Sequence, residues 1–203
     1  MSLKHSIKAE ANQLGFVLFG VAPSASPPHH PAYQAWIRAG RQAGMAYLAR
    51  PEALTSRSTP EQLLPGCRSI LCVGLPYPLP LPPPAAEPDK VRGRIAAYAT
   101  LPDYHNILAS KLEALAVRLP SLTGKNVHWR ACVDTAPILE KDYAFLAGLG
   151  WIGRNSLLLT PKFGSYVFLG ELLTDLELEP DEPLQGDPCA QCYQCVQACP
   201  TRA

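Results

Sequence analysis

Four cysteines lie near the end of the chain in the order Cys189-x2-Cys192-x2-Cys195-x3-Cys199-Pro200. This spacing is typical of iron–sulfur ligation, in which thiolates from one short segment surround a cubane cluster. A zinc knuckle is the alternative, but structural zinc sites normally pair two separated Cys-x2-Cys units. The motif therefore predicts chemistry that moves single electrons.

The same spacing bears on the number of clusters. In this motif the first three cysteines bind one cluster, and the fourth, here Cys199, usually ligates a second. The remaining ligands of both clusters must then come from sequence after Ala203, the last residue. We therefore expect the chain to be a fragment of a longer protein, with both clusters incomplete.

A second group of polar residues begins at Asp134, in the run Asp134-Thr-Ala-Pro-Ile-Leu-Glu-Lys. Asp134 follows an apolar run and precedes a helical pattern, a junction where ligand and catalytic groups often lie in α/β proteins. The same signals are typical of a helix N-cap, so position alone leaves both roles open. Gly148, Gly150 and Gly153 follow, but they lack the strand–turn–helix context of a dinucleotide-binding loop. A role in which glycine lets the backbone approach a flat ligand closely is therefore favoured.

Two further polar residues are weaker candidates. His105 ends the run Tyr98-Ala-Thr-Leu-Pro-Asp-Tyr-His at an expected strand-to-helix junction. A lone histidine is more often structural than a ligand, so the structural role is favoured. Arg57 lies in a polar loop, where a solvated charge is the simplest interpretation.

Hydrophobic periodicity and turn residues predict the elements that must position these groups. Helices are predicted over about 3–15, 32–48, 104–119 and 136–147, the third capped by Asp103. Strands are predicted over 16–21, 69–75, 94–99 and 126–133, with a final pair over 156–160 and 166–173 that turns at 161–164. The proline-rich run from Pro76 to Pro88 excludes helix and central strand and indicates a surface loop.

Helices and strands mix without strict βαβ regularity. This predicts the α/β class, with a mixed α+β sheet and flanking helices. The acidic, proline-bearing segment 175–188 is typical of a linker. We therefore expect one domain over residues 1–175, and over 176–203 the linker and the beginning of a cluster-binding domain.

Composition restricts the remaining possibilities. The 203 residues are 47% hydrophobic and carry a net charge of +1, which predicts a globular chain without global attraction to nucleic acid or membrane. No apolar stretch approaches the roughly 20 residues of a membrane helix. The N-terminus lacks an apolar signal core, so we expect a cytoplasmic protein. Reduced thiols at Cys67, Cys72 and Cys132 fit that compartment.

On these motifs the chain resembles the epoxyqueuosine reductases, the cobalamin-dependent iron–sulfur enzymes of tRNA queuosine synthesis. The resemblance extends over essentially the whole chain, and its most specific block is Gly148-Leu-Gly-Trp-Ile-Gly-Arg-Asn155 beside the cysteine motif. Further matching blocks are Gly44-Met45-x-Tyr47-Leu48, Leu64-Pro65-Gly66-Cys67-Arg68-Ser69, Tyr98, Asp103-Tyr104-His105, Asp134-Thr-Ala-Pro137, Phe163-Gly164-Ser165 and Leu169-Gly170-Glu171.

This resemblance implies a cobalamin-binding, reductase-like domain followed by a ferredoxin-like domain with two 4Fe–4S clusters. It implies that epoxyqueuosine at the wobble position of tRNA is reduced to queuosine, with the epoxide oxygen removed as water. It also implies an external electron donor, such as flavodoxin or ferredoxin with its reductase. We expect a monomer that does not act at a membrane.

The resemblance also assigns residues to roles. Asp134 matches the proposed proton donor of the family, which favours the catalytic role over the helix cap. Because ligands of both clusters are missing, we expect this chain alone not to turn over. The matching cofactor residues are Arg57, Tyr98, Asp134, Ser156 and Lys162 near the corrin, with Cys189, Cys192, Cys195 and Cys199 as cluster ligands.

Two other functions stay open. A corrinoid iron–sulfur reductive dehalogenase could use the same scaffold, although the chain shows no twin-arginine leader. A ferredoxin-type electron carrier could use the four cysteines, but it leaves the residues around Asp134 and the block 148–156 unexplained.

Overall fold

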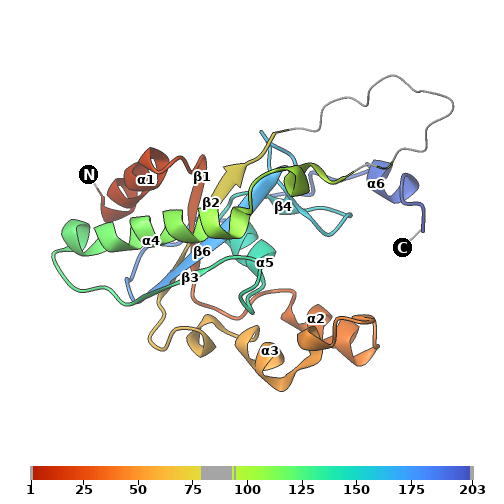
Figure 1. Ribbon diagram of the computed structural model, residues 1–203, viewed down its shortest axis with the longest axis horizontal. Helices are drawn as coiled ribbons and strands as arrows, with labels where there is room; N and C mark the ends of the chain where they lie inside the picture. Colours follow the sequence, from red (N-terminus) through yellow and green to blue (C-terminus); the bar gives the residue numbers. More distant parts are fainter. Residues whose placement is uncertain (1, 79–92, 94, 202–203) are drawn as a thin grey trace.

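The computed structural model describes residues 2–78, 93 and 95–201 (Figure 1). The α-helices are α1 (Leu3–Gln13), α2 (His30–Arg38), α3 (Pro51–Ser56), α4 (Tyr104–Thr123), α5 (Glu140–Leu146) and α6 (Gln194–Gln197). The strands are β1 (Leu18–Pro23), β2 (Ser69–Pro76), β3 (Trp129–Cys132), β4 (Trp151–Ile152), β5 (Leu158–Leu159) and β6 (Val167–Thr174). Short 3₁₀ helices are η1 (Ala46–Ala49), η2 (Pro60–Gln62) and η3 (Ala97–Thr100).

One antiparallel sheet forms the centre of the molecule, with strand order β1-β2-β6-β3. β2 and β6 pair along their whole length, from Ser69 opposite Thr174 to Pro76 opposite Val167. β4 and β5 form a separate two-stranded ribbon. The predicted α/β class, with a sheet and flanking helices, is confirmed, and the sheet is antiparallel.

Helices cover both faces of this sheet. Along β2, Leu71 and Val73 pack in the core that includes α1 and α4, whereas Ile70 and Cys72 pack in the core that includes α5. This alternation follows from the two-residue period of side chains along a strand. In Figure 1 α4 crosses in front of the sheet, and α2 and α3 form a lobe below it.

The helix predicted after Asp103 is confirmed. The Asp103 carboxylate accepts the amide N–H of His105 at 2.9 Å, which satisfies one of the free donors at the start of α4. Leu108, Leu112 and Leu115 of its apolar stripe are fully buried. The helix runs to Thr123, and Gly124 ends it in the left-handed conformation at φ 70°.

The other predicted helices are shorter than their patterns indicated. The helix predicted over 32–48 ends at Arg38, and Gly40, at φ 67°, leads into turns. The helix predicted from residue 136 begins only at Glu140. Proline-led α3 was not predicted, because six residues give too short a window for helical periodicity.

The strand predicted over 94–99 is wrong. Ala97–Thr100 form the 3₁₀ helix η3, and Arg94 lies outside the described residues. Alanine has low strand propensity and little surface to bury, so this apolar run had weak support from packing. Most of the predicted proline-rich loop over 76–88 also lies outside the described residues.

The predicted pairing of the last two strands is wrong as well. β5 pairs with β4, and β6 inserts between β2 and β3. The predicted turn at 161–164 closes only an isolated bridge between Thr160 and Gly164. Because β6 carries apolar residues on both faces, burial between two neighbours stabilises it more than an edge hairpin does.

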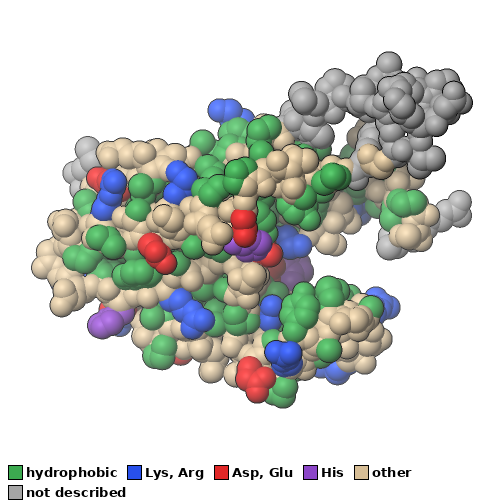
Figure 2. Space-filling model, viewed as in Figure 1, with side chains coloured by type: hydrophobic (Ala, Val, Ile, Leu, Met, Phe, Trp, Pro, Cys, Tyr) green, Lys and Arg blue, Asp and Glu red, His purple; other side chains and the backbone are tan. Residues whose placement is uncertain are grey.

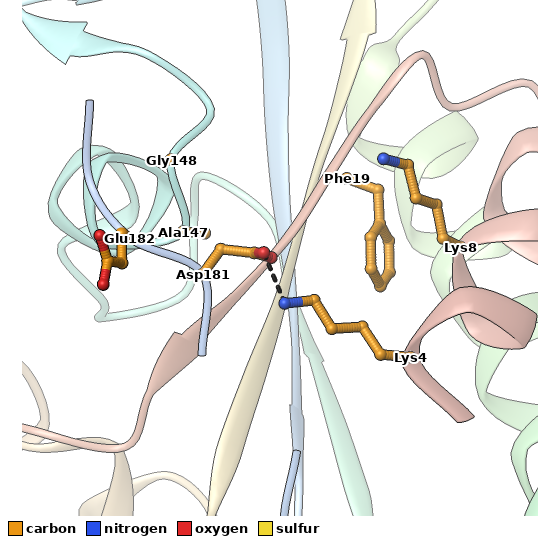
Figure 3. Close-up of a pocket in the computed structure, with 7 residues that line it drawn as sticks. All are labelled: Lys4, Lys8, Phe19, Ala147, Gly148, Asp181 and Glu182. Carbon is orange, nitrogen blue, oxygen red and sulfur yellow. Dashed lines mark hydrogen bonds and ion pairs between the residues drawn. The ribbon is translucent and has the colours of Figure 1, made fainter. Parts of the chain in front are cut away.

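The segment after β6 stays against the sheet before it reaches the cysteines. Leu176 and Leu178 are buried in the core. Asp181 accepts the Val21 amide N–H at 2.9 Å, and its own amide donates to the Val21 carbonyl at 2.8 Å. In Figure 3 Lys4 reaches from α1 to the Asp181 carboxylate, at 2.5 Å. The small pocket in Figure 3 is therefore the place where α1, β1 and the segment after β6 meet.

Cys67, Cys72 and Cys132 are buried free thiols, in agreement with the prediction. Burial raises the pKa of all three, to about 12 for Cys132, because a thiolate loses its hydration in the core. Within the described ranges, no helix combines the length and the apolar character needed to span a membrane.

Candidate active site

Asp134 lies in the turn that follows β3. Its φ of +30° lies in the left-handed region, which is rare for a residue with a side chain and is often found where backbone strain is held at a functional site. The N-cap of α5 is Leu139, so the helix-cap interpretation of Asp134 is wrong. The Asp134 side chain is 53% exposed and is free to face a ligand.

His105 connects Asp134 to α4. Its Nε2 lies 3.1 Å from Asp134 Oδ2, and its Nδ1 lies 2.7 Å from Asp103 Oδ1. The hydrogen bonds to Asp103 and then to Asp134 raise the pKa of His105, because each carboxylate stabilises the imidazolium. His105 therefore holds the carboxylate of Asp134. The sequence had favoured a purely structural role for this histidine and did not predict this contact.

We expect Asp103→Asn and Asp134→Asn each to lower the pKa of His105, with the larger effect from Asp103. The pKa of His105 is higher in the folded than in the unfolded protein, so its pairs with Asp103 and Asp134 stabilise the fold. This stabilisation is complete below about pH 6.5 and is lost as the pH rises through the folded-state pKa of His105. NMR titration of the imidazole measures the change, and His5 on α1 serves as the control. An unchanged His105 midpoint in both variants would contradict the geometry.

An aromatic row of Tyr77, Phe168, Tyr104 and Tyr98 lies on one side of Asp134. The rings of Tyr104 and Phe168 stack with centroids 4.2 Å apart, and Tyr77 lies 4.5 Å from Phe168. Tyr98 meets Tyr104 edge-on at 6.4 Å. With Asp134 the row lines an aromatic groove of about 430 Å³, and stacked rings of this kind suit a flat apolar ligand.

The lobe of α2 and α3 lies on the other side of Asp134. Figure 2 shows a notch between this lobe, where Lys and Arg side chains gather, and the rest of the molecule. Tyr47, Arg50 and Arg57 face Asp134 across a lobe groove of about 890 Å³. An adjoining α2 groove of about 650 Å³ is lined by Tyr33, Trp36, Arg57, Asp134, Glu140 and Ser156, among others. Asp134 therefore borders three neighbouring grooves.

Arg57 is held in place, unlike the solvated charge that its sequence context favoured. Its guanidinium carbon lies 5.5 Å from the centroid of the Tyr33 ring, and its Nη1 donates to the Ala53 carbonyl at 3.3 Å. The cation–π contact fixes the side chain at the wall shared by the lobe groove and the α2 groove.

The structure brings most of the predicted cofactor residues together. Arg57, Tyr98 and Ser156 each line a groove that also includes Asp134. Lys162 lines none of these three grooves; its ammonium lies 5.2 Å from the centroid of the Phe163 ring.

The glycines at 148, 150 and 153 make room for the chain itself. A Cβ on Gly150 would lie 2.2 Å from the Leu159 carbonyl oxygen, and one on Gly148 would lie 2.6 Å from the Glu182 carbonyl oxygen. Contacts within the chain thus explain these glycines, and their approach to a flat ligand stays a prediction. They bring β4 against β5 and seat the segment after β6.

Two glutamates near Asp134 were missed from the sequence. Glu140 lines the aromatic and α2 grooves, and burial followed by the negative charge of Asp134 raises its pKa to about 7. Glu171 is 0% exposed within β6. The available signal was a single acidic residue in the otherwise apolar run 167–173, since a charge is rarely buried without a reason.

The cysteine segment contacts the rest of the chain through Arg154. The Arg154 Nη2 donates to the Ala190 carbonyl at 2.7 Å, and its guanidinium carbon lies 4.6 Å from the centroid of the Tyr193 ring. Cys192 and Cys195 are exposed. Across the part of the chain that the structure describes, no three potential metal ligands converge on one point. The donor chemistry of four thiols nevertheless fits an iron–sulfur cluster.

Comparison with known proteins points to one family of enzymes. The family model "Epoxyqueuosine reductase QueG, DUF1730" matches residues 57–135. The epoxyqueuosine reductase of Synechococcus sp. (strain RCC307) is 38% identical over 205 residues, which cover 99% of this chain and 61% of that protein. Over 99% of its length, this chain is similar to the epoxyqueuosine reductases. The chain spans about three fifths of the length of the Synechococcus protein and 54% of the length of the Vibrio cholerae epoxyqueuosine reductase.

Solved epoxyqueuosine reductases share the fold of this chain. The Streptococcus thermophilus enzyme matches all of this chain and 53% of its own, with a TM-score of 0.87 and 30% identity. A structure with an epoxyqueuosine-modified tRNA-Tyr stem loop has a TM-score of 0.80 and 29% identity, over 99% of this chain and 52% of its own. The Bacillus subtilis enzyme, with an aspartate catalytic loop swung out of the active site, has a TM-score of 0.78 and 28% identity over the same fractions.

The likeness to reductive dehalogenases concerns the fold alone. A catabolic reductive dehalogenase matches 92% of this chain and 21% of its own, with a TM-score of 0.53 and 17% identity. The predicted resemblance to the epoxyqueuosine reductases is thus confirmed, together with the expected relation in fold to the dehalogenases.

Proposed function

We propose that the protein to which this chain belongs reduces epoxyqueuosine to queuosine in tRNA, with cobalamin bound in the grooves around Asp134. The position of Asp134 between these grooves, in a chain similar to the epoxyqueuosine reductases, carries the proposal. The relative solved with an epoxyqueuosine-modified stem loop supports the substrate. The Bacillus subtilis relative, with its aspartate catalytic loop, supports the role of Asp134.

The residues around Asp134 fit a large flat cofactor. The aromatic row provides a planar apolar wall, and the lobe groove adds about 890 Å³ with arginines on its rim. When bound, cobalamin supplies a strongly reducing cobalt centre. We propose that Arg57, Tyr98, Asp134, Ser156 and Lys162 hold it. Lys162 rests on family resemblance alone, since it lies outside the grooves.

Asp134 acts in this proposal as a general acid. The oxygen of an opening epoxide needs a proton, and a carboxylic acid within reach can provide it. Asp134 must be protonated to do so. A large flat cofactor over its half-exposed carboxyl would exclude water from this side chain. His105 fixes the carboxyl from the other side through its 3.1 Å contact.

The iron–sulfur clusters, the electron donor, the domain division and the location in the cell are proposed from the resemblance to epoxyqueuosine reductases. Cys189, Cys192, Cys195 and Cys199 ligate two 4Fe–4S clusters together with further residues of the whole protein, and the clusters pass electrons from flavodoxin or ferredoxin. Residues 1–175 bind cobalamin, and 176–203 lead into a ferredoxin-like domain. The whole protein acts as a monomer in the cytoplasm.

Cobalamin binding tests this proposal on the chain itself. Cob(II)alamin is mixed with the protein, and the excess is removed by gel filtration. We expect the corrinoid absorbance to elute with the wild type and to be reduced in Arg57→Ala, because this change removes a wall of two grooves. Arg41→Ala, on an exposed part of the lobe outside the grooves, is the control. Separate elution of cobalamin and wild-type protein would reject the assigned site.

A further inference from the structure

Reduction of an epoxide to an alkene consumes two electrons and two protons. Both carbon–oxygen bonds of the ring break, a carbon–carbon double bond forms, and the oxygen leaves as water. Under the proposed function the cofactors supply the two electrons, and Asp134 supplies one proton. The second proton still needs a donor.

Glu140 is a second carboxyl that borders the same space. It is the first residue of α5, and it lines the aromatic groove and the α2 groove together with Asp134. The charge of Asp134 acts on the Glu140 carboxyl, in keeping with their shared place beside these grooves. The turn after β3 and the start of α5 therefore hold both carboxyls beside one cavity.

The surroundings of Glu140 favour its protonated form. Burial acts first, and the charge of Asp134 second, to raise its pKa to about 7, while Lys141, the Asp134 amide and His105 oppose the shift. An acid whose pKa lies near the working pH can both hold and release a proton. The titratable groups that face Glu140 are Asp134 in the turn, Lys141 on α5, His105 and Tyr104 on α4, and Glu171 on β6.

Glu171 lies behind this pair as a neutral group. Both of its carboxyl oxygens are buried and lack a hydrogen-bond partner among the residues described. Its cross-strand neighbours are Cys72 on β2 and Cys132 on β3, so two buried thiols flank it. An unpaired carboxylate at this depth is strongly unfavourable, and burial holds the pKa of Glu171 well above its usual range. Glu171 lines none of the three grooves around Asp134, whereas Glu140 lines two of them and can pass a proton to a ligand there.

We propose that Glu140 is a second general acid, which delivers the second proton to the departing oxygen after Asp134 has delivered the first. The oxygen then leaves as water, and both carboxylates regain protons from solvent. This inference rests on the proposed function, because only a reaction that removes oxygen as water needs the second proton.

A titration tests the protonation of Glu140 without any cofactor. ¹³C NMR of glutamate carboxyls is recorded over pH 4–9 on this chain, and Glu140→Gln identifies the signal of Glu140. We expect that signal to titrate well above the ordinary glutamate range near pH 4.3. A midpoint inside the ordinary range would overturn the proposal.

Turnover tests the role of Glu140 in the reaction. The whole protein, loaded with cobalamin and clusters, is given an epoxyqueuosine-modified stem loop. We expect Glu140→Gln to lower kcat about 100-fold with KM unchanged, and to abolish the fall of kcat as the pH rises through 7. Glu140→Asp, which keeps the acid, should restore part of the rate. Glu113→Gln, at an exposed position of α4, is the matched control.

The outcomes separate this inference from the function on which it rests. If Asp134→Asn is inactive while Glu140→Gln keeps the wild-type kcat and pH profile, the second acid is wrong and the function stands. If the loaded wild type leaves epoxyqueuosine unchanged, the proposed function fails, and the role of Glu140 fails with it.

Discussion

Asp134→Asn is expected to lower the rate of epoxyqueuosine reduction by about 10²–10⁴-fold, the usual contribution of a general acid. Asparagine keeps the size of the side chain, and its amide oxygen can still contact His105 Nε2, now 3.1 Å from Asp134 Oδ2. It has no acidic proton for the departing oxygen. Single-turnover reduction of an epoxyqueuosine-modified stem loop by the whole, cofactor-loaded protein measures the effect.

The control for this variant is Asp175→Asn. Asp175 pairs with His128 at 2.8 Å just after the end of β6, and it lines none of the three grooves around Asp134. We expect this control to turn over normally, and we expect Asp134→Asn to retain its cobalamin spectrum and its Tm. Normal turnover by Asp134→Asn would show that another group protonates the oxygen first.

The second large effect is expected from Gly20→Ala in β1. A Cβ at this position would lie 2.1 Å from the Ala147 carbonyl oxygen and 2.8 Å from Leu149 Cδ1. The oxygen belongs to the backbone that ends α5, so it cannot rotate away, and α5 must shift from the sheet. We expect a loss of about 3 kcal/mol of stability, or about 10 °C in Tm, measured by thermal unfolding.

Gly44→Ala provides the matched control for this change. A Cβ at Gly44 meets no atom within 4 Å, and its φ lies outside the left-handed region. We expect its Tm to stay within about 2 °C of the wild type, since surface changes are usually small. Equal Tm values for Gly20→Ala and the wild type would show that α5 does not depend on close contact with β1.

The elements that could be predicted depend on residues close together in the sequence, and those that could not depend on residues far apart. The helix after Asp103 was predictable, because its cap and its apolar stripe lie within a few residues of each other. The partners of β6 were not, because strand pairing joins Leu172 to Leu71, a neighbour that is distant in the sequence. A local pattern predicts a strand but contains no information on its partners.

The same limit applies to the candidate site. Motif and family resemblance found Asp134, and the polar run before α4 made His105 visible. Their 3.1 Å contact depends on how α4 and β3 pack, which no spacing along the chain encodes. Glu171 was visible as one acidic residue in an apolar run, but the sequence does not show that β2 and β3 cover it on both sides.

The central place of β6 has a consequence for synthesis of the protein. β2 and β3 both need β6 as their neighbour, yet Val167–Thr174 is the last strand of the sheet to leave the ribosome. Until then the apolar β2 has an unpaired edge, and such edges invite association between nascent chains. The four-stranded sheet can form only after Thr174, the last residue of β6, has left the ribosome. Folding of the sheet is therefore delayed until all four of its strands have been translated.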